Sequence, residues 1–400
     1  MNKMISNKSL HEIDQKHYLP TFRRYPIALE RGEGSHVWDV EGNKYIDMLA
    51  GIAVSNIGHA HPHLVKAIAD QAAKLIHISN FYVSEPQMKL VEKLATLSGL
   101  ERVFLGNSGA EALEGAIKIA RKYGSKNGRG SQIIAMEGAF HGRTLATVAA
   151  TGKKAMMIGF DPIPTGFSHV PFNDIEKLKS AITDDVVGIM MEPIQGEGGV
   201  NPASQQYLEQ VRALCDEHNI ALIFDEVQTG IGRTGKMFAH EHYGIKPDIM
   251  TLAKGLGGGV PIGAVLASEK VGQAIDWGDH GTTFGGNPLA SSAALAVLDV
   301  IESERLLAEA TEKGQWIADQ LNAAKAEYPE IEEVRGKGLM IGIQVSVDPK
   351  AVVSTMLEKK VLANATAGNV IRLVPPLNIK KSQLEEVMEI LLASIKENRK

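Results

Sequence analysis

The segment LGNSGAEA at residues 105–112 combines residue types that could bind a phosphate group. A strand-like run ends there, Ser108 lies between two glycines, and a helix-like run begins. Backbone N–H groups at a helix start, aided by the helix dipole, form a phosphate site that small residues leave open. A plain glycine turn with Ser108 as the helix cap explains the segment equally well. Two other phosphate loops are excluded, because no Lys-Ser or Lys-Thr pair follows the glycines and the GxGxxG spacing is missing.

A carboxylate follows the apolar run at residues 220–224, where Asp225 begins the segment DEVQ. Open α/β sheets bind ligands beyond the C-terminal ends of their strands, so Asp225 is placed to contact one. Asp225 and Glu226 could form the metal-binding pair of a nucleotide hydrolase, but the lysine loop of such enzymes is missing. Asp225 could instead pair with a cationic ring nitrogen, and Gln228 could hydrogen-bond a ring hydroxyl. No metal site is expected.

Lys254 follows another buried-looking run at residues 248–252 and precedes a run of glycines. A solvated surface position is usual for lysine, and this residue alone is a weak signal. Its neighbours Ala253, Gly255 and Leu256, however, offer little that would solvate an ammonium group. Partial burial and a nearby cation lower the pKa of a lysine and make its amine a nucleophile that forms Schiff bases.

The three segments together match the needs of one cofactor. Pyridoxal 5'-phosphate requires an anion site for its phosphate, a lysine for its aldehyde and an acid beside its pyridine nitrogen. Asp225 would keep that nitrogen protonated, so that the ring absorbs the electron pair released when a substrate C–H bond breaks. Phe140, in AFHGRT at residues 139–144, is suited to stack on the ring face, although a core position explains it equally well.

The elements that would position these residues alternate between strand-like and helix-like runs from about residue 62 onward. Strands are predicted at 103–105, 132–136, 186–191, 220–224, 248–252 and 262–266, and helices at 62–75, 86–98, 109–123 and 204–218. Continuous apolar strands separated by helices predict an α/β fold with a mainly parallel sheet that is covered on both faces.

A second, smaller α+β unit is predicted beyond this sheet. A helix-like stretch at 288–326 leads out of the large domain, and runs at 338–345, 350–360, 370–374 and 381–396 alternate between strand and helix. The segment VWDVEGNKYIDM near the N-terminus is typical of a hairpin and is expected to pack with this unit. We therefore expect an N-terminal segment 1–60 that joins the small domain, a large cofactor-binding domain 61–295 and a small C-terminal domain 296–400.

Composition and charge are those of a globular protein without a polyanionic partner. The chain has 400 residues, 44% of them apolar and 22% charged, with a formal net charge of −5. No basic surface for nucleic acid or an anionic membrane is expected. No apolar run reaches the ~20 residues that cross a bilayer, and the first residues lack the apolar region of a secretory signal. The single cysteine, Cys215, fits a reducing compartment, so a cytoplasmic protein is expected.

Seven motifs, in the expected order, make the chain similar to the class III (subgroup II) aminotransferases, which have the type I fold of aspartate aminotransferase. The motifs are FLGNSGAEA, GAFHGRT, EPIQGEGGV, FDEVQTGIGRTG, LAKGLGGGVPIGA, HGTTFGGNPLA and IRLVPPL. The resemblance extends over roughly residues 20–395, and within the class it is greatest to the acetylornithine and succinylornithine branch. FDEVQTGIGRTG and the lysine loop are highly specific, whereas GxSGxEA by itself is not.

This resemblance implies a role for each matching position. The implied cofactor-binding residues are Ser108, Gly109, Ala110, Phe140, His141, Asp225, Glu226, Val227, Gln228, Lys254 and Thr283, with Lys254 and Asp225 also catalytic. Thr283 would reach the phosphate in the other subunit of a homodimer with shared active sites. Thr282 would lie beside the substrate.

The resemblance also implies how one pocket could bind two substrates in turn. Glutamate has a carboxylate near its reacting carbon and another far from it, whereas N2-acetylornithine reacts at a terminal amine and has only a remote carboxylate. Arg143 would hold the distal carboxylate of both substrates, and Arg372 the near carboxylate of glutamate. Glu197 would pair with Arg372 while the acylated donor is bound, because a lone buried charge is costly. Without the family pattern, structural or surface ion pairs would be the preferred explanation of these three residues and of Glu192.

The implied reaction moves the terminal amino group of N2-acetylornithine, or of another N-acylornithine, to 2-oxoglutarate, giving N-acetylglutamate 5-semialdehyde and glutamate in arginine biosynthesis. Phe22 favours an acylated donor, because ornithine aminotransferases have a tyrosine at the matching place for free ornithine. The alternatives are transamination of ornithine, 4-aminobutyrate, putrescine or acylated lysine precursors, aminomutase or decarboxylase chemistry, and a non-enzymatic scaffold. The scaffold alternative predicts a broken set of cofactor residues, whereas every cofactor position is intact.

Overall fold

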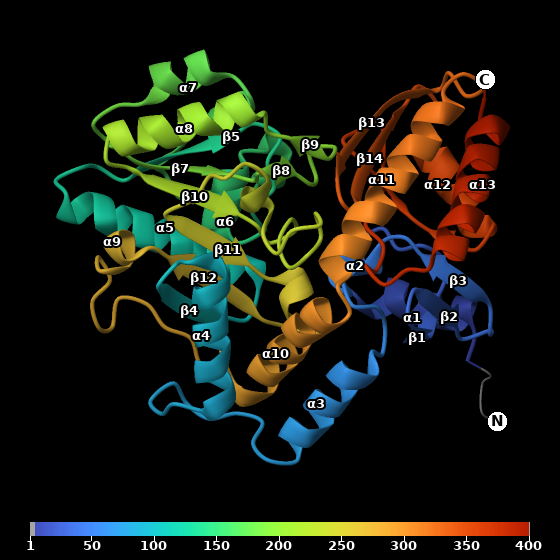
Figure 1. Ribbon diagram of the computed structural model, residues 1–400, viewed down its shortest axis with the longest axis horizontal. Coiled ribbons are helices and arrows are strands. Elements are labelled where there is room, and N and C mark those ends of the chain that lie inside the picture. The colour runs from blue at the N-terminus through green and yellow to red at the C-terminus, as the bar shows by residue number, and fades with distance from the viewer. Residues whose placement is uncertain (1–4, 400) are drawn as a thin grey trace.

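The computed structural model describes residues 5–399 and has a seven-stranded sheet at the centre of its larger part (Figure 1). The strand order is β4-β12-β11-β10-β7-β5-β6. These strands are β4 (Arg102–Gly106), β5 (Gln132–Met136), β6 (Phe167–Val170), β7 (Val186–Met191), β10 (Ala221–Asp225), β11 (Ile249–Leu252) and β12 (Gly263–Ala267). Only β12 is antiparallel to its neighbours, and the other pairs are parallel. The predicted α/β fold with a mainly parallel sheet is confirmed.

Successive strand residues point to opposite faces of the sheet, so both faces are apolar, and helices cover both of them. Ile133 of β5 packs in a cluster with α5 (Gly109–Lys126), whereas its neighbour Ile134 packs with α7 (Ile175–Ala181) and α8 (Gln205–Glu217). Every residue of β7 is buried, as the unbroken apolar sequence predicts for a strand covered on both sides. The loops at the strand ends therefore extend from a sheet that is packed on both faces.

The smaller part joins the two ends of the chain (Figure 1). One sheet has the order β1-β2-β3-β15 and the other β13-β14-β17-β16. Their bounds are β1 (Leu29–Glu33), β2 (His36–Asp39), β3 (Lys44–Asp47), β13 (Ile331–Lys337), β14 (Met340–Val345), β15 (Val361–Leu362), β16 (Asn364–Thr366) and β17 (Val370–Leu373). The predicted hairpin forms β2 and β3, and β3 pairs in parallel with β15 near the other end of the chain. On this basis we propose the domain division at about residues 60 and 295.

The helix-like stretch at 288–326 was expected to be continuous and is not. It forms α10 (Pro288–Ser303) and α11 (Leu306–Ala324), separated at Arg305, whose φ of 55° is left-handed and cannot continue a helix. Strand β13 was not predicted, because its sequence IEEVRGK has no apolar alternation. Helices α12 (Pro349–Glu358) and α13 (Lys381–Glu397) match predicted runs.

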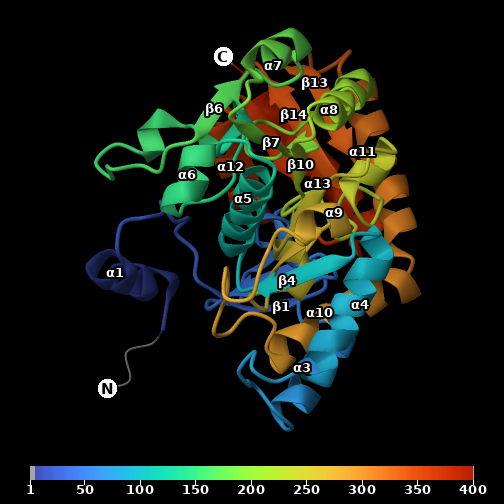
Figure 2. The same cartoon turned by 90° about the vertical axis from the view of Figure 1, so that its left-hand side faces the viewer.

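The remaining elements are short or lie at the periphery. They are α1 (Asn7–His17), α2 (Ala50–Ala53), α3 (Pro62–Ala72), α4 (Glu85–Ser98), α6 (Leu145–Thr151), α9 (Glu269–Gly272), β8 (Ile194–Gln195), β9 (Asn201–Pro202) and the 3-10 turns η1 (Lys154–Met156), η2 (Ala239–His242) and η3 (Lys254–Gly257). Figure 2 shows α1 standing away from the rest of the molecule. No helix between residues 5 and 399 is long and apolar enough to cross a membrane.

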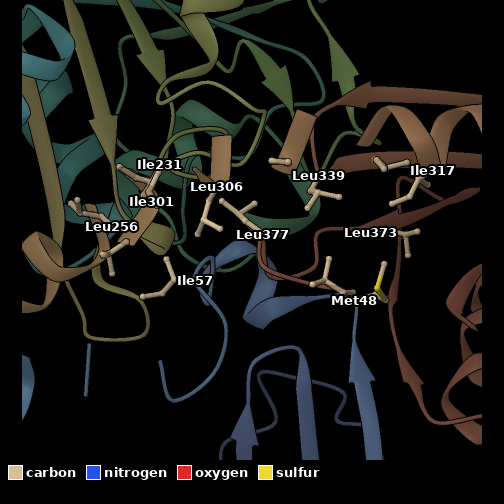
Figure 3. Close-up of a cluster of buried hydrophobic side chains, with 14 of the residues drawn as sticks. Met48, Ile57, Ile231, Leu256, Ile301, Leu306, Ile317, Leu339, Leu373 and Leu377 are labelled. Atoms are coloured by element: carbon tan, nitrogen blue, oxygen red, sulfur yellow. The ribbon is translucent and has the colours of Figure 1, made fainter. Parts of the chain in front are cut away.

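One apolar core runs across the junction of the two parts. Ile231 and Leu256 from the large part, Leu339 and Leu377 from the small part and Ile57 from the N-terminal segment belong to one buried cluster, and Figure 3 shows Leu377 between Ile231 and Leu339. The junction is therefore packed as a protein interior is packed, which restricts sliding between the parts.

Candidate active site

The sequence-predicted segments converge on a cavity of about 430 Å³ at the C-terminal edge of the large sheet. Its walls come from the segments that follow β4, β5, β10 and β11, as expected for a ligand site in an open α/β sheet. The lining residues include Asn107, Ser108, Gly109, Ala110, Phe140, His141, Arg143, Glu192, Asp225, Val227, Gln228 and Lys254.

The start of α5 forms one wall of this cavity. Ser108 caps the helix, and its hydroxyl accepts a hydrogen bond from the Glu111 N–H at 3.2 Å. The first N–H groups of a helix have no partner inside it, so those of Gly109 and Ala110, which line the cavity, suit an anion. A Cβ atom at Gly109 would lie 2.9 Å from the Val227 side chain, so a larger residue does not fit there. Both the cap and the phosphate-site explanations of Ser108 are compatible with this geometry.

Asp225 is buried at the end of β10 and is held by three donors. One carboxylate oxygen lies 2.8 Å from His141 Nδ1, and the other accepts bonds from the Val227 N–H at 3.0 Å and the Thr251 hydroxyl at 3.4 Å. Burial opposes ionisation of His141, but its hydrogen bond to Asp225 and the Asp225 charge outweigh burial and raise its pKa. The Asp225 carboxylate is thus held in a fixed position, with a histidine on one side.

Lys254 follows β11 in a left-handed backbone conformation, with a φ of 41°. Burial lowers the pKa of Lys254 to about 8, and the cation of Arg372 acts in the same direction. The carboxylates of Glu197, Asp225 and Glu192 act against burial. The amine is therefore available as a nucleophile closer to neutral pH than an exposed lysine.

Glu192 is a site residue that the sequence analysis did not select. It is buried, lines the cavity and accepts hydrogen bonds at 3.1 Å from the Phe140 N–H and from the Gly196 N–H. Burial raises its pKa, and Asp225 acts in the same direction. It ties the Phe140 loop to the loop that carries Glu197. A carboxylate directly after the buried strand at 186–191 was the available signal, the same one that singled out Asp225.

Phe140 and Arg143 both line the cavity, and they contact each other. The Arg143 guanidinium lies over the Phe140 ring, 5.7 Å from its centroid. Phe140 is half-buried and Arg143 is exposed, so Arg143 lies where a charged ligand could approach it. This placement is compatible with a ring on Phe140 and a carboxylate on Arg143.

Arg372 and Glu197 form an ion pair beside this cavity rather than in its wall. Arg372 is fully buried in β17 and also donates to Gln228 Oε1 at 3.2 Å, which connects it to the cavity. Its Nη2 has no partner among residues 5–399. Burial opposes ionisation of Glu197, but the charge of Arg372 outweighs burial and lowers the Glu197 pKa.

Thr282 and Thr283 lie outside the cavity that contains Lys254. Both line a separate hollow of about 930 Å³ with Phe81 and Trp277. The Thr282 hydroxyl accepts a bond from Asn107 Nδ2 at 3.1 Å, so this segment touches the start of the phosphate-site loop. Phe22 is 71% exposed and is not part of the cavity wall, so the single chain lends no support to its effect on donor choice.

Glu226 is turned away from the cavity, and the prediction that it binds the cofactor is not supported. Its buried carboxylate accepts bonds from the Ala239 N–H at 2.6 Å and the His240 N–H at 2.8 Å. It also contacts the His240 ring and the Thr229 hydroxyl. Neighbouring residues at a strand end point in opposite directions, so only Asp225 can face the cavity. Glu226 instead fixes the 3-10 turn η2.

The donor set fits pyridoxal phosphate. A helix start that can hold an anion, a lysine with a lowered pKa and a buried carboxylate all line one cavity. The residues that would hold the phosphate, the aldehyde and the ring nitrogen are Ser108–Ala110, Lys254 and Asp225 respectively. The cavity is also within the size range of small-molecule sites.

Comparisons with known proteins agree with this chemistry. The family model described as aminotransferase class-III matches residues 19–395. An acetylornithine aminotransferase from Methanocaldococcus jannaschii is 53% identical over 389 residues, which covers 97% of this chain and 98% of the relative.

Solved structures with similar folds are also aminotransferases. Ornithine aminotransferase from Toxoplasma gondii has a TM-score of 0.96 at 34% identity, covering 99% of this chain and 97% of that one. N-acetylornithine aminotransferase from Stenotrophomonas maltophilia has a TM-score of 0.84 at 40% identity, covering 96% and 98%. With nearly the whole chain matched, this protein belongs to the class-III aminotransferases, and its cofactor is pyridoxal phosphate.

Proposed function

We propose that this aminotransferase moves the terminal amino group of an N2-acylornithine, principally N2-acetylornithine, to 2-oxoglutarate. The products are N-acetylglutamate 5-semialdehyde and glutamate, and we place the reaction in the cytoplasm, in arginine biosynthesis. The names of three similar curated relatives support this donor. The observation that carries the proposal is the ion pair between fully buried Arg372 and partly exposed Glu197.

This ion pair suits an enzyme that binds two different groups at one place. Glutamate must put a carboxylate near Arg372, and the acylated donor must put an uncharged methylene there. Glu197 neutralises Arg372 when the acylated donor is bound. Its side chain is 27% exposed, so it has room to move outward when glutamate is bound. A lone buried arginine would otherwise oppose the binding of the methylene. Free ornithine and 4-aminobutyrate remain alternative donors for the same scaffold.

The residues around the cavity then have separate tasks. Pyridoxal phosphate, when bound, supplies an electron sink for the pair released at the reacting carbon. Lys254 would hold the cofactor at rest, and its Nζ would then accept a proton from the reacting substrate carbon, as a base, and donate it to the cofactor carbon, as an acid. Asp225, supported by His141, holds the charge of the ring nitrogen. Phe140, Val227 and Gln228 orient the ring, and Arg143 holds the distal carboxylate of either substrate.

Replacing Glu197 with alanine is expected to invert the donor preference. Opening the pair costs about 1.5–3 kcal/mol for a charge-assisted hydrogen bond, which is roughly one to two decades in apparent affinity for glutamate. Glu197→Ala should therefore improve the glutamate half-reaction and weaken that of N2-acetylornithine. Arg372→Ala should do the opposite, and Arg143→Ala should weaken both. The measurement is the rate of each half-reaction, followed by the change in cofactor absorbance.

Glu333→Ala is the matched control for the loss of a carboxylate. Glu333 pairs with Arg335 at 2.6 Å, and Arg335 donates to the Gly199 carbonyl in the loop that carries Glu197. This control should leave the ratio of the two half-reactions unchanged. Equal slowing of both donors in Glu197→Ala would make Glu197 a structural ion-pair partner only and remove the basis for this donor assignment.

We further propose a homodimer in which each active site takes Thr283 from the other subunit. Thr283 lies outside the Lys254 cavity of its own chain. The side chains of Phe81, Trp277 and Phe284 near it are largely exposed, and α1 has no buried residue. Large exposed apolar surfaces of this kind mark protein interfaces.

A mixture of two inactive variants should recover activity if the sites are shared. Lys254→Ala lacks the lysine, and Thr283→Asp places a carboxylate where the phosphate must bind. A heterodimer of the two has one site with both residues intact, so random exchange should restore about a quarter of the unaltered activity. Differently tagged subunits allow heterodimers to be isolated and assayed directly. Inactive heterodimers, after exchange is demonstrated, would exclude a shared site.

A further inference from the structure

Arg233 is a fully buried cation at the junction of the two parts of the molecule, and its bonds go to neutral oxygens. It donates to the Leu339 carbonyl at 2.9 Å, the Pro375 carbonyl at 2.6 Å and the Asn56 side-chain oxygen at 2.6 Å. Its Nε has no partner among residues 5–399. Burial lowers the pKa of Arg233 to about 9, which reflects how poorly this place solvates a charge. A charge held at such a place is an inefficient source of stability.

The partners of Arg233 connect it to the arginine of the proposed substrate site. Pro375 lies three residues beyond Arg372, in the segment that leaves β17. Leu339 precedes β14, the strand paired with β17, and its N–H donates back to the Arg233 carbonyl at 3.1 Å. Arg233 itself lies in the loop after Asp225. One side chain therefore links the strand that carries Arg372 to the strand end that carries Asp225.

Asn56 connects the same group of bonds to the lysine turn. The Asn56 side-chain Nδ2 donates to the Ile231 carbonyl at 2.8 Å, and the Asn56 backbone carbonyl accepts a hydrogen bond from the Leu377 N–H at 2.7 Å. A Cβ atom at Gly255, the residue after Lys254, would lie only 2.3 Å from Asn56 Nδ2. The Asn56 amide is thus packed directly against the turn that positions Lys254, and glycine is required there.

The surroundings make these bonds rigid. Ile231, Leu339 and Leu377 belong to the apolar core that crosses the junction, and Figure 3 shows Leu377 between the other two. Polar bonds inside an apolar core are costly to break, and a partly satisfied group has no water to turn to. The junction is accordingly fixed at one spacing.

We propose that Arg233 and Asn56 are positioning residues that hold Arg372 at a set distance from Lys254 across this junction. The inference rests on the proposed roles of Lys254 and Arg372. Glutamate must meet both residues at once, whereas the acylated donor does not need the Arg372 charge. A shift of the junction therefore harms the glutamate half-reaction more than the other, since a misplacement of about 1 Å can cost about 100-fold in rate.

Arg233→Met tests the first half of the inference. It removes the charge and every donor while it keeps an unbranched apolar side chain. We expect kcat/KM of the glutamate half-reaction to fall at least about tenfold further than that of N2-acetylornithine. Arg233→Lys keeps the charge but has fewer hydrogen-bond donors, so it should change the ratio of kcat/KM between the glutamate and N2-acetylornithine half-reactions less. If the methionine variant does not fold, this ratio is measured on the lysine variant.

Arg212→Met is the control for the loss of an arginine, one that is partly buried. Arg212 lies in the same large domain and pairs with Asp216 and Asp248, both at 2.8 Å, away from the junction. It should lower the thermal midpoint and leave the ratio unchanged. If both Arg233 variants slow the two half-reactions by the same factor, Arg233 is only structural and the inference is overturned.

Asn56→Ala tests the link to the lysine turn without relying on turnover. Removing the amide opens space beside Gly255, so the lysine is less desolvated. The pH midpoint for attachment of pyridoxal phosphate to the apoprotein should then move upward. Glu197, Arg372, Asp225 and Glu192, the charged groups that act on Lys254, are unaltered.

Asn378→Ala is the control, because Asn378 donates to the neighbouring Ile57 carbonyl at 2.8 Å. It should leave the midpoint in place. If Asn56→Ala leaves the pH midpoint of cofactor attachment unchanged, Asn56 does not position the turn that carries Lys254. If the unaltered enzyme fails to react with N2-acetylornithine, the proposed function is wrong. The positioning role of Arg233 and Asn56 is then tested by the pH midpoint of cofactor attachment and by the rate of the glutamate half-reaction alone.

Discussion

Replacing Lys254 with alanine is expected to abolish both turnover and covalent attachment of pyridoxal phosphate. The amine lies in a buried turn after β11, and burial lowers its pKa to about 8. Such an amine is a nucleophile for the cofactor aldehyde and a base for the substrate proton. Loss of both tasks should reduce turnover by about 10⁴-fold or more. The helix start that would hold the phosphate is unchanged, so the variant should still bind the cofactor without a bond that borohydride can reduce.

Peptide mass mapping after borohydride reduction tests this assignment directly. In the unaltered protein the label should lie on Lys254. Lys153→Ala is the control, because the charge of Lys153 also acts on Glu197 although this lysine is outside the cavity wall. A label on any other lysine would exclude Lys254 as the attachment point.

The pH dependence of attachment provides an independent measurement. Only the neutral amine attacks the aldehyde, so attachment to the apoprotein should speed up as pH rises through the Lys254 pKa of about 8. For an exposed lysine the corresponding midpoint would be about 10.4. A midpoint near that of an exposed lysine would show that burial does not activate this amine.

The inner strands of the central sheet were predictable because they are buried on both faces, whereas the edge strand β6 is only partly buried and was not predicted. Residues 132–136 and 186–191 are unbroken apolar runs, and the structure has β5 and β7 at those positions. Strand β13 was missed because it lies at the edge of a small sheet with charged residues such as Glu332 and Glu333 exposed. The break at Arg305 was missed because both flanking helices have helical periodicity and nothing in the residue type requires a left-handed backbone.

Motif order predicted many of the residues that line the cavity but not which way each side chain points. Asp225 and Glu226 are adjacent carboxylates, and only the strand direction shows that one faces the cavity and the other faces η2. Glu192 was not selected as a site residue because its carboxylate accepts hydrogen bonds from two backbone N–H groups, and the sequence cannot show which backbone groups need a partner. The role of Arg233 could not be predicted from its motif, because its hydrogen bonds reach segments more than 100 residues away.

Replacing Asp225 with asparagine is expected to reduce turnover by about 100-fold or more. The carboxylate is buried and fixed by His141, the Val227 N–H and Thr251, so it faces the cavity as a preorganised negative charge. A neutral amide cannot keep a pyridine nitrogen protonated, and an unprotonated ring is a poor electron sink. Cofactor content should fall much less than turnover, because Lys254 and the start of α5 are unchanged. Turnover and bound cofactor are measured on the same preparation.

Two comparisons separate the charge of Asp225 from its structural bonds. Thr251→Val removes only the longest of the three bonds to the carboxylate and should change turnover by less than about tenfold. Asp225→Ala can be loaded with a cofactor methylated at the ring nitrogen, which carries a fixed positive charge and needs no acid partner. If charge is the function of Asp225, this cofactor should recover part of the lost activity. If the methylated cofactor recovers no activity, although Asp225→Ala still binds the ordinary cofactor, the carboxylate acts by holding His141 and Val227 in place. Near-normal turnover of Asp225→Ala with the ordinary cofactor would remove Asp225 from the reaction altogether.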